Sequence, residues 1–159
     1  MDETYIKVHG RWRYLYRAIS RSGALVDVML SEKRDMEAAK RFFRSARTVT
    51  GVSPSRVTTD GHDSYPRAIR EGLGETVRHR TSKYLNNRIE QDHRGIKSRY
   101  GLMKGFGNVS SAARFCRCHD ELRDLLRCHA RHDRNSIAAT RRRWFLRGSR
   151  IALDVLIAA

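Results

Sequence analysis

The sequence contains little cysteine and little proline, and it has no long hydrophobic run. Its three cysteines lie between residues 116 and 128. An odd, clustered set of cysteines is not the disulfide framework of a small secreted domain, so it favours a reducing cytoplasm. The first four residues have neither the basic nor the apolar region of a signal peptide. The longest apolar run, residues 151–159, is too short to span a bilayer and contains Asp154. We therefore expect a soluble cytoplasmic protein without membrane contact.

Acidic residues are also in the minority. The chain has 33 Lys and Arg residues against 17 Asp and Glu residues, a formal net charge of +16, and 40% of its 159 residues are hydrophobic. This composition is typical of a folded domain that binds a polyanion, and it argues against a disordered tail. Nucleic acid is the first candidate, with binding that weakens as salt rises. A ribosome-associated or otherwise generic basic protein remains the alternative.

The first thirty residues alternate between apolar and polar positions, which predicts strands. The predicted strands cover residues 4–8, 11–20 and 24–30, with short turns between them. Three such strands form an antiparallel meander. Trp12, Tyr14 and Tyr16 share one face of the second strand, where packing beneath a helix is favoured over base stacking.

Helical spacing begins after the third strand. Residues 34–46 are predicted to form a helix with Asp35 as N-cap, followed by a strand at 55–60, a short helix at 64–74 and a strand at 76–80. Two longer helices are predicted from Ser82 to Tyr100 and from Ser110 to Ala130. The order predicts an α/β fold, a mixed sheet with a meander and parallel strands flanked by helices. We assign residues 1–130 to this domain and residues 131–159 to a basic C-terminal extension.

Three carboxylates stand out within this basic chain. Asp2 begins the first strand, Asp60 ends the strand at 55–60, and Glu90 lies in the helix that follows. The carboxyl ends of strands are where open sheets build ligand sites. Clustered carboxylates repel one another unless hard cations such as Mg²⁺ or Mn²⁺ bind them. Two such ions, about 3.5–4 Å apart, can promote displacement at a phosphodiester while the surrounding basic residues hold the backbone.

Each of the three acids also has an ordinary structural interpretation. Asp2 could be an exposed terminal residue, and Asp60 with Gly61 is a common turn pair. Glu90 could complete a capping box with Asn87 as N-cap. That role disappears if the helix begins at Ser82.

Several segments carry a resemblance to a known family. They are DETYIKV, WRYLYRAIS, TDGHDSYP and HRTSKYLNNRIEQDHRGIK, at residues 2–8, 12–20, 59–66 and 79–97. They resemble the catalytic domain of the insertion-sequence-six family of bacterial DDE transposases, and the likeness extends from Met1 to about His129. The resemblance implies a ribonuclease H-like core, as in retroviral integrases. It also implies DNA cleavage at insertion-sequence ends and strand transfer into target DNA, with Mg²⁺ activating water.

The same resemblance implies roles for individual residues. Asp2, Asp60 and Glu90 match the metal-binding catalytic triad. Lys97 lies seven residues after Glu90, about two helical turns on, and resembles a basic residue that contacts the element end. The further DNA-contact candidates on this helix are Arg94, His93 and Arg88. His93 could equally be an ordinary helix-surface residue. The expected partner is double-stranded DNA, bound by a homo-oligomer associated with the nucleoid.

The sequence also departs from the family pattern. Asp2 directly follows Met1, so the helix-turn-helix that recognises element ends is expected to be absent. The interval between Asp60 and Glu90 is also shorter than in many members. We therefore expect a truncated gene or a misplaced start, and an inactive remnant that only binds DNA is the alternative function.

A zinc site is a weaker possibility. The segment 116–132 contains three cysteines and three histidines. On a helix, however, Cys116 and Cys118 would point to different faces, so we expect ordinary thiols.

Overall fold

The computed structural model describes residues 1–82, 87–125 and 138–158. Its first three strands form an antiparallel sheet in the order β1-β2-β3, with bounds Asp2–Val8, Arg11–Ile19 and Leu25–Ser31. Tyr5 lies opposite Tyr14 and Leu15 lies opposite Leu30. The turn between β1 and β2 uses positive φ angles at His9 and Gly10, 48° and 76°. The predicted meander is confirmed.

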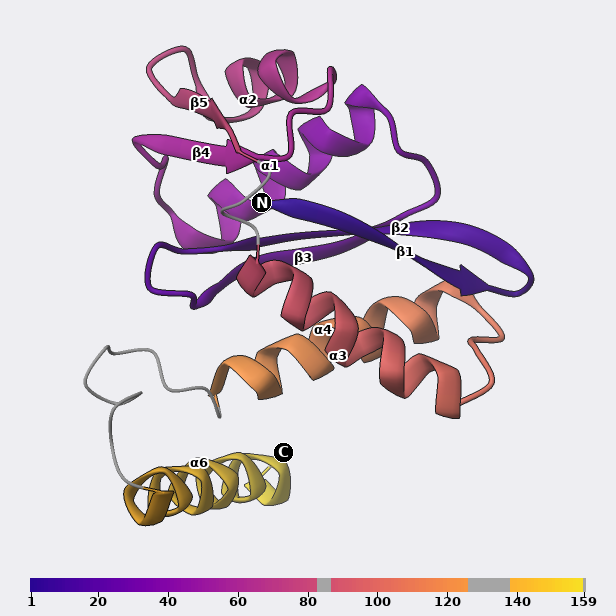
Figure 1. Ribbon diagram of the computed structural model, residues 1–159, viewed down its shortest axis with the longest axis vertical. Helices are drawn as coiled ribbons and strands as arrows, with labels where there is room; N and C mark the ends of the chain where they lie inside the picture. Colours follow the sequence, from indigo (N-terminus) through magenta and orange to yellow (C-terminus); the bar gives the residue numbers. More distant parts are fainter. Residues whose placement is uncertain (83–86, 126–137, 159) are drawn as a thin grey trace.

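The helix α1 covers one face of this sheet and extends over Met36–Thr50 (Figure 1). It begins where predicted, because the Asp35 side chain accepts a hydrogen bond of 2.8 Å from the Ala38 amide. It ends at Gly51, whose φ of 66° is left-handed. The cap and the apolar stripe together account for both the position and the orientation of α1.

A parallel pair of short strands follows. These are β4, Arg56–Thr59, and β5, Arg78–Thr81, connected by the helix α2, Tyr65–Leu73. The β4–β5 pair is a second ladder and not a continuation of the first. The two meet at the start of β1, where the Met1 amino group donates a 2.8 Å hydrogen bond to the Thr58 carbonyl. The C-terminal end of β4 therefore lies beside the N-terminal end of β1 (Figure 1).

The helices α3, Asn87–Leu102, and α4, Val109–Leu125, cover the opposite face of the meander (Figure 1). Ser82 is not helical, so the predicted start of α3 was too early. Residues 83–86, between Ser82 and the start of α3, lie outside the described residues. The predicted end of α4 beyond residue 125 also lies outside them. Because α3 is described from Asn87, Glu90 lies in its first turn.

Two apolar clusters form the core, one on each side of the meander. Because both faces are covered, Leu15, Tyr16 and Arg17 in the middle of β2 are all buried. Trp12 was predicted to pack beneath a helix, and this was wrong, since it is 54% exposed. Trp12 lies next to the β1–β2 turn, in a part of the sheet that α1 does not shield from solvent.

The two described cysteines of the segment considered for zinc differ in their exposure. Cys116 is buried and Cys118 is exposed, as helical spacing predicts. Among the described residues, the only candidate metal group contains neither cysteine. Cys128, His129 and His132 lie outside the described residues.

The last described element is a helix, α6, over Ala138–Ala158. Trp144, Phe145 and Leu146 on this helix are exposed, as are several of its later apolar residues. No helix in the described ranges combines the length and the apolar character needed to cross a membrane.

Candidate active site

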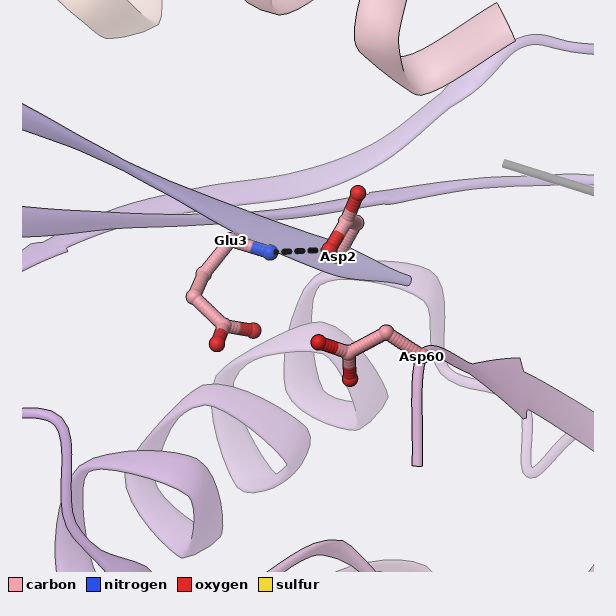
Figure 2. Close-up of side chains that lie close together, drawn as sticks. All are labelled: Asp2, Glu3 and Asp60. Atoms are coloured by element: carbon pink, nitrogen blue, oxygen red, sulfur yellow. Dashed lines mark hydrogen bonds between the residues drawn. The ribbon is translucent and has the colours of Figure 1, made fainter. Parts of the chain in front are cut away.

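Asp2 and Asp60 lie side by side, although 57 residues separate the strand ends that carry them. Asp2 begins β1, and Asp60 directly follows β4. One carboxylate oxygen from each, together with one from Glu3, lies within 4.8 Å of the others (Figure 2). The Met1–Thr58 hydrogen bond that joins the two ladders holds these strand ends together.

Glu90 lies outside this group of three carboxylates. It is an exposed residue in the first turn of α3. Its charge still contributes to the raised pKa of Asp2, after the larger effects of burial and Asp60. A fourth carboxylate would be repelled by the other three unless a cation were bound among them. The structure thus brings together two members of the predicted triad and leaves the third nearby.

Burial and mutual repulsion perturb two of these acids. Burial, followed by the charge of Asp60, raises the pKa of Asp2 to about 6, although the Glu3 amide donates a 2.9 Å hydrogen bond to its Oδ1. Burial also raises the pKa of Glu3 to about 7, and the Arg34 guanidinium opposes that shift. Carboxylates held this close favour a bound cation, which would return both pKa values toward their ordinary range.

Glu3 was not predicted as a site residue, although it adjoins Asp2. Its side chain is 4% exposed, accepts a hydrogen bond from the Tyr65 hydroxyl and forms an ion pair with Arg34. Arg34 also approaches Asp60, with Nη2 at 3.5 Å from Oδ2. A guanidinium therefore supplies positive charge to two of the three acids. Only the adjacency of Asp2 and Glu3 could have indicated this from the sequence.

The loop that carries Asp60 is fixed by β5. The Thr59 hydroxyl lies 2.9 Å from His79 Nε2 and accepts a 3.1 Å hydrogen bond from the Gly61 amide. Gly61 has a φ of 96°, and a Cβ placed there would lie 2.5 Å from the Thr81 methyl group. Glycine is required at this position for both conformation and space.

The basic candidates on α3 differ in their surroundings. Arg94 and Lys97 are exposed, and Lys97 Nζ lies 4.6 Å from the centroid of the Tyr5 ring. His93 is 7% exposed, and burial lowers its pKa to about 3. His93 is therefore a neutral residue of the interior, and we do not retain it as a DNA contact. The side chain of Arg88 lies outside what the structure describes.

The donor set fits a hard divalent cation. Asp2, Glu3, Asp60 and Glu90 offer only carboxylate oxygens, the ligands that Mg²⁺ and Mn²⁺ prefer. Lys97 and Arg94 are exposed on α3, the helix whose first turn carries Glu90. Chemically, this arrangement suits the binding of a phosphodiester next to a metal ion.

The DDE domain family matches residues 1–141 of the chain, which covers both strand ends, α3 and α4. The chain belongs to this family. Within this family, the chain corresponds to the catalytic domain of an insertion-sequence-six transposase, in agreement with the sequence motifs.

Curated relatives agree with this assignment. The transposase for insertion sequence-like element IS431mec of Staphylococcus aureus is 38% identical over 122 residues, covering 74% of this chain and 54% of the relative. The transposase for insertion sequence element IS257 in transposon Tn4003, also of Staphylococcus aureus, matches with the same identity and coverage. The chain thus spans about half the length of the curated relatives it matches.

A solved structure supports the fold. A chain of the simian T-cell lymphotropic virus intasome, determined by cryo-EM in complex with PP2A regulatory subunit B56 gamma, matches with a TM-score of 0.56. The match has 16% sequence identity and covers 72% of this chain and 44% of that chain. The ribonuclease H-like fold expected from the sequence is therefore confirmed.

Proposed function

We propose that this chain is the catalytic domain of a DNA transposase that cleaves phosphodiesters at insertion-sequence ends and transfers the freed strand to target DNA. The observation that carries the proposal is the juxtaposition of Asp2 and Asp60 at the ends of neighbouring strands. Glu90 lies in the first turn of α3, and its charge contributes to the raised pKa of Asp2. Membership of the DDE domain family supports the same reaction.

Asp2, Asp60 and Glu90 are the proposed ligands of two Mg²⁺ or Mn²⁺ ions. When bound, these ions would lower the pKa of the attacking water or hydroxyl group and stabilise the leaving oxygen. Divalent-metal dependence is general for DDE domains, whereas the number and kind of ions are part of the proposal. Glu3 neighbours the ligands, and its contacts with Tyr65 and Arg34 hold the start of β1 in place.

Basic residues on α3 are proposed to bind the DNA backbone. Lys97 and Arg94 are exposed on the helix that carries Glu90, and Arg88 occupies its first turn. The net charge of +16 favours the same partner, double-stranded DNA. We further propose that the protein acts as a homo-oligomer on paired DNA ends, and that residues 1–130 form the catalytic unit with residues 131–159 as an extension.

A second candidate is a DNA-binding remnant without catalytic activity. The specific observation in its favour is the position of Glu90 outside the carboxylate group. If α3 cannot bring Glu90 to the ions, the basic surface would still bind DNA but no cleavage would follow.

A strand-transfer assay tests the proposal. The protein is mixed with pre-cleaved element-end DNA, a supercoiled plasmid and Mg²⁺ or Mn²⁺, alongside Glu90→Gln and the control Glu75→Gln, an exposed residue after α2. We expect joined product from the wild type and from Glu75→Gln, and none from Glu90→Gln or without metal. Salt-sensitive binding without joining by any of the three proteins would favour the remnant.

A further inference from the structure

Two large aromatic rings lie exposed on the β1–β2 hairpin. Tyr5 is 53% exposed and Trp12 is 54% exposed. Their ring centroids are 5.0 Å apart and the planes are nearly perpendicular, at 88°. Strand pairing places Trp12 opposite Lys7, two residues after Tyr5, so both rings are on one face of the sheet.

Two ammonium groups accompany these rings. Lys97 Nζ from α3 lies 4.6 Å from the Tyr5 centroid, and Lys7 Nζ lies 5.7 Å from the Trp12 ring. Both distances are within the range of cation–π attraction. We call Tyr5, Trp12, Lys7 and Lys97 together the aromatic platform.

Core packing does not account for the platform. Tyr16 lies on the same face of β2 and is buried against Phe42 of α1. Tyr5 and Trp12 lie further along the hairpin, where more than half of each side chain remains in solvent. A cross-strand aromatic pair adds some stability to a hairpin. It does not require two ammonium groups around it.

The platform lies close to the candidate active site. Tyr5 is three residues after Asp2, about 10 Å along β1, and it shares a face of the sheet with Glu3, whose carboxylate lies beside those of Asp2 and Asp60. Lys97 is on the helix that carries Glu90. A DNA strand whose phosphodiester reached Asp2 and Asp60 would therefore have a neighbouring nucleotide within reach of the rings.

We propose that the aromatic platform binds an unpaired nucleobase of the DNA strand next to the phosphodiester held at Asp2 and Asp60. This inference rests on the proposed function. Aromatic rings bind bases by stacking, and a base inside a duplex has both faces occupied by its neighbours, so the base concerned is unpaired. Lys7 and Lys97 complement the adjacent phosphates. The platform would thus favour frayed or overhanging ends over blunt duplex.

Binding measurements without metal test the platform separately from catalysis. Fluorescence anisotropy compares a labelled duplex with a three-nucleotide overhang, the same duplex with abasic residues in that overhang, and a blunt duplex. We expect the wild type to bind the base-bearing overhang about tenfold more tightly than the abasic one. Trp12→Leu should remove that preference and leave blunt-duplex binding unchanged. The matched control Trp144→Leu, at an exposed tryptophan on α6, should retain it.

A second measurement keeps the platform intact. The sequence contains two tryptophans, so Trp144→Phe leaves Trp12 as the sole one. We expect base-bearing overhangs to quench its fluorescence and abasic overhangs not to. Equal binding of the two overhangs, with no difference in quenching, would overturn the platform even if Trp12→Leu failed to fold.

The platform and the proposed function fail in different ways. Asp60→Asn should lose strand transfer and keep the preference for a base-bearing overhang. Strand transfer without any such preference would refute the platform alone. A base preference without strand transfer by the wild type would leave the platform standing and count against the catalytic function.

Discussion

Arg17 on β2 and Asp120 on α4 form a buried ion pair across 103 residues of sequence. Arg17 Nε lies 2.9 Å from Asp120 Oδ2, and Arg17 Nη2 lies 2.5 Å from both carboxylate oxygens. The two residues are 0% and 5% exposed, and His119 Nδ1 lies 3.2 Å from Asp120 Oδ1. This pair fixes α4 on the face of the meander that α3 also covers.

Removing one partner of this pair should be strongly destabilising. Asp120→Asn leaves the Arg17 charge buried without compensation, and we expect a loss of about 3–5 kcal/mol in the free energy of unfolding, measured with urea. The double variant Arg17→Met with Asp120→Leu should recover most of it. Arg67→Gln, which breaks the exposed pair with Glu71, serves as the control and should barely change the midpoint. A loss for Asp120→Asn below about 1 kcal/mol would contradict a desolvated pair.

His93 should make the fold sensitive to acid. Burial is the main cause of its pKa of about 3, with smaller effects from Arg17 and Lys97 that lower it and from Asp120 that raises it. Between its folded and unfolded pKa values, the unfolded chain binds the extra proton, so stability falls as pH falls below about 6.5. We expect a loss of about 2 kcal/mol between pH 7 and pH 5 attributable to this residue.

The comparison with His93→Gln isolates that effect. The variant should lose less stability over the same pH interval than the wild type, while the exposed control His9→Asn should follow the wild type. Parallel pH profiles for the wild type and His93→Gln would show that His93 does not remain neutral in the folded state.

Arg34 should act as an internal counter-ion of the candidate metal site. It forms an ion pair with Glu3 and approaches Asp60, yet its side chain is 37% exposed. Arg34→Gln should therefore lower metal-free stability by only about 1 kcal/mol. Mn²⁺ should then raise the melting temperature of this variant more than that of the wild type, at about pH 8, which is above the raised pKa values of Asp2 and Glu3. The exposed control Arg70→Gln should respond to Mn²⁺ as the wild type does. An equal rise in melting temperature for Arg34→Gln and the wild type would refute this role for Arg34.

The loop after β4 should tolerate no side chain at Gly61. Gly61→Ala combines a positive φ with a clash against the Thr81 methyl group, and we expect a loss of about 1–3 kcal/mol together with weaker Mn²⁺ binding. Gly74→Ala separates the two effects, because Gly74 has a φ of 114° and no atom within 4 Å of an added Cβ. It should lose some stability and leave Mn²⁺ binding unchanged. Equal losses in stability and in Mn²⁺ binding for both variants would mean that the clash has no role in placing Asp60.

Local patterns predicted most of the elements. Alternation in β1 and the Asp35 cap before α1 are properties of short segments, so the sequence alone reveals them. The motifs at residues 2–8, 59–66 and 79–97 identified the family and the ribonuclease H-like fold. Asp2, Asp60 and Glu90 were predicted to lie together, and the structure brings Asp2 and Asp60 together with Glu90 outside the group.

Tertiary packing decided what the sequence could not. Arg17 is a charged residue in the middle of β2, and only α4, more than a hundred residues later, explains its burial. Trp12 has the pattern of a core residue but lies beyond the cover of α1. His93 stands within a basic, polar segment, although packing places it in the interior. The start of α3 was misplaced because Ser82 and Asn87 are both N-cap residue types, and the sequence pattern did not decide between them.

The most direct test of the proposed site is a titration with Mn²⁺, followed by electron paramagnetic resonance, on the wild type and on Asp60→Asn, Glu90→Gln and Glu3→Gln. It needs neither DNA nor any further part of the protein. If Asp2, Asp60 and Glu90 are the ligands, the wild type should bind two ions. Asp60→Asn and Glu90→Gln should bind fewer or weaken binding at least about tenfold, and Glu3→Gln should change it little. Unchanged binding by Glu90→Gln, with loss of binding by Glu3→Gln, would contradict the proposed triad and place the metal on Asp2, Glu3 and Asp60.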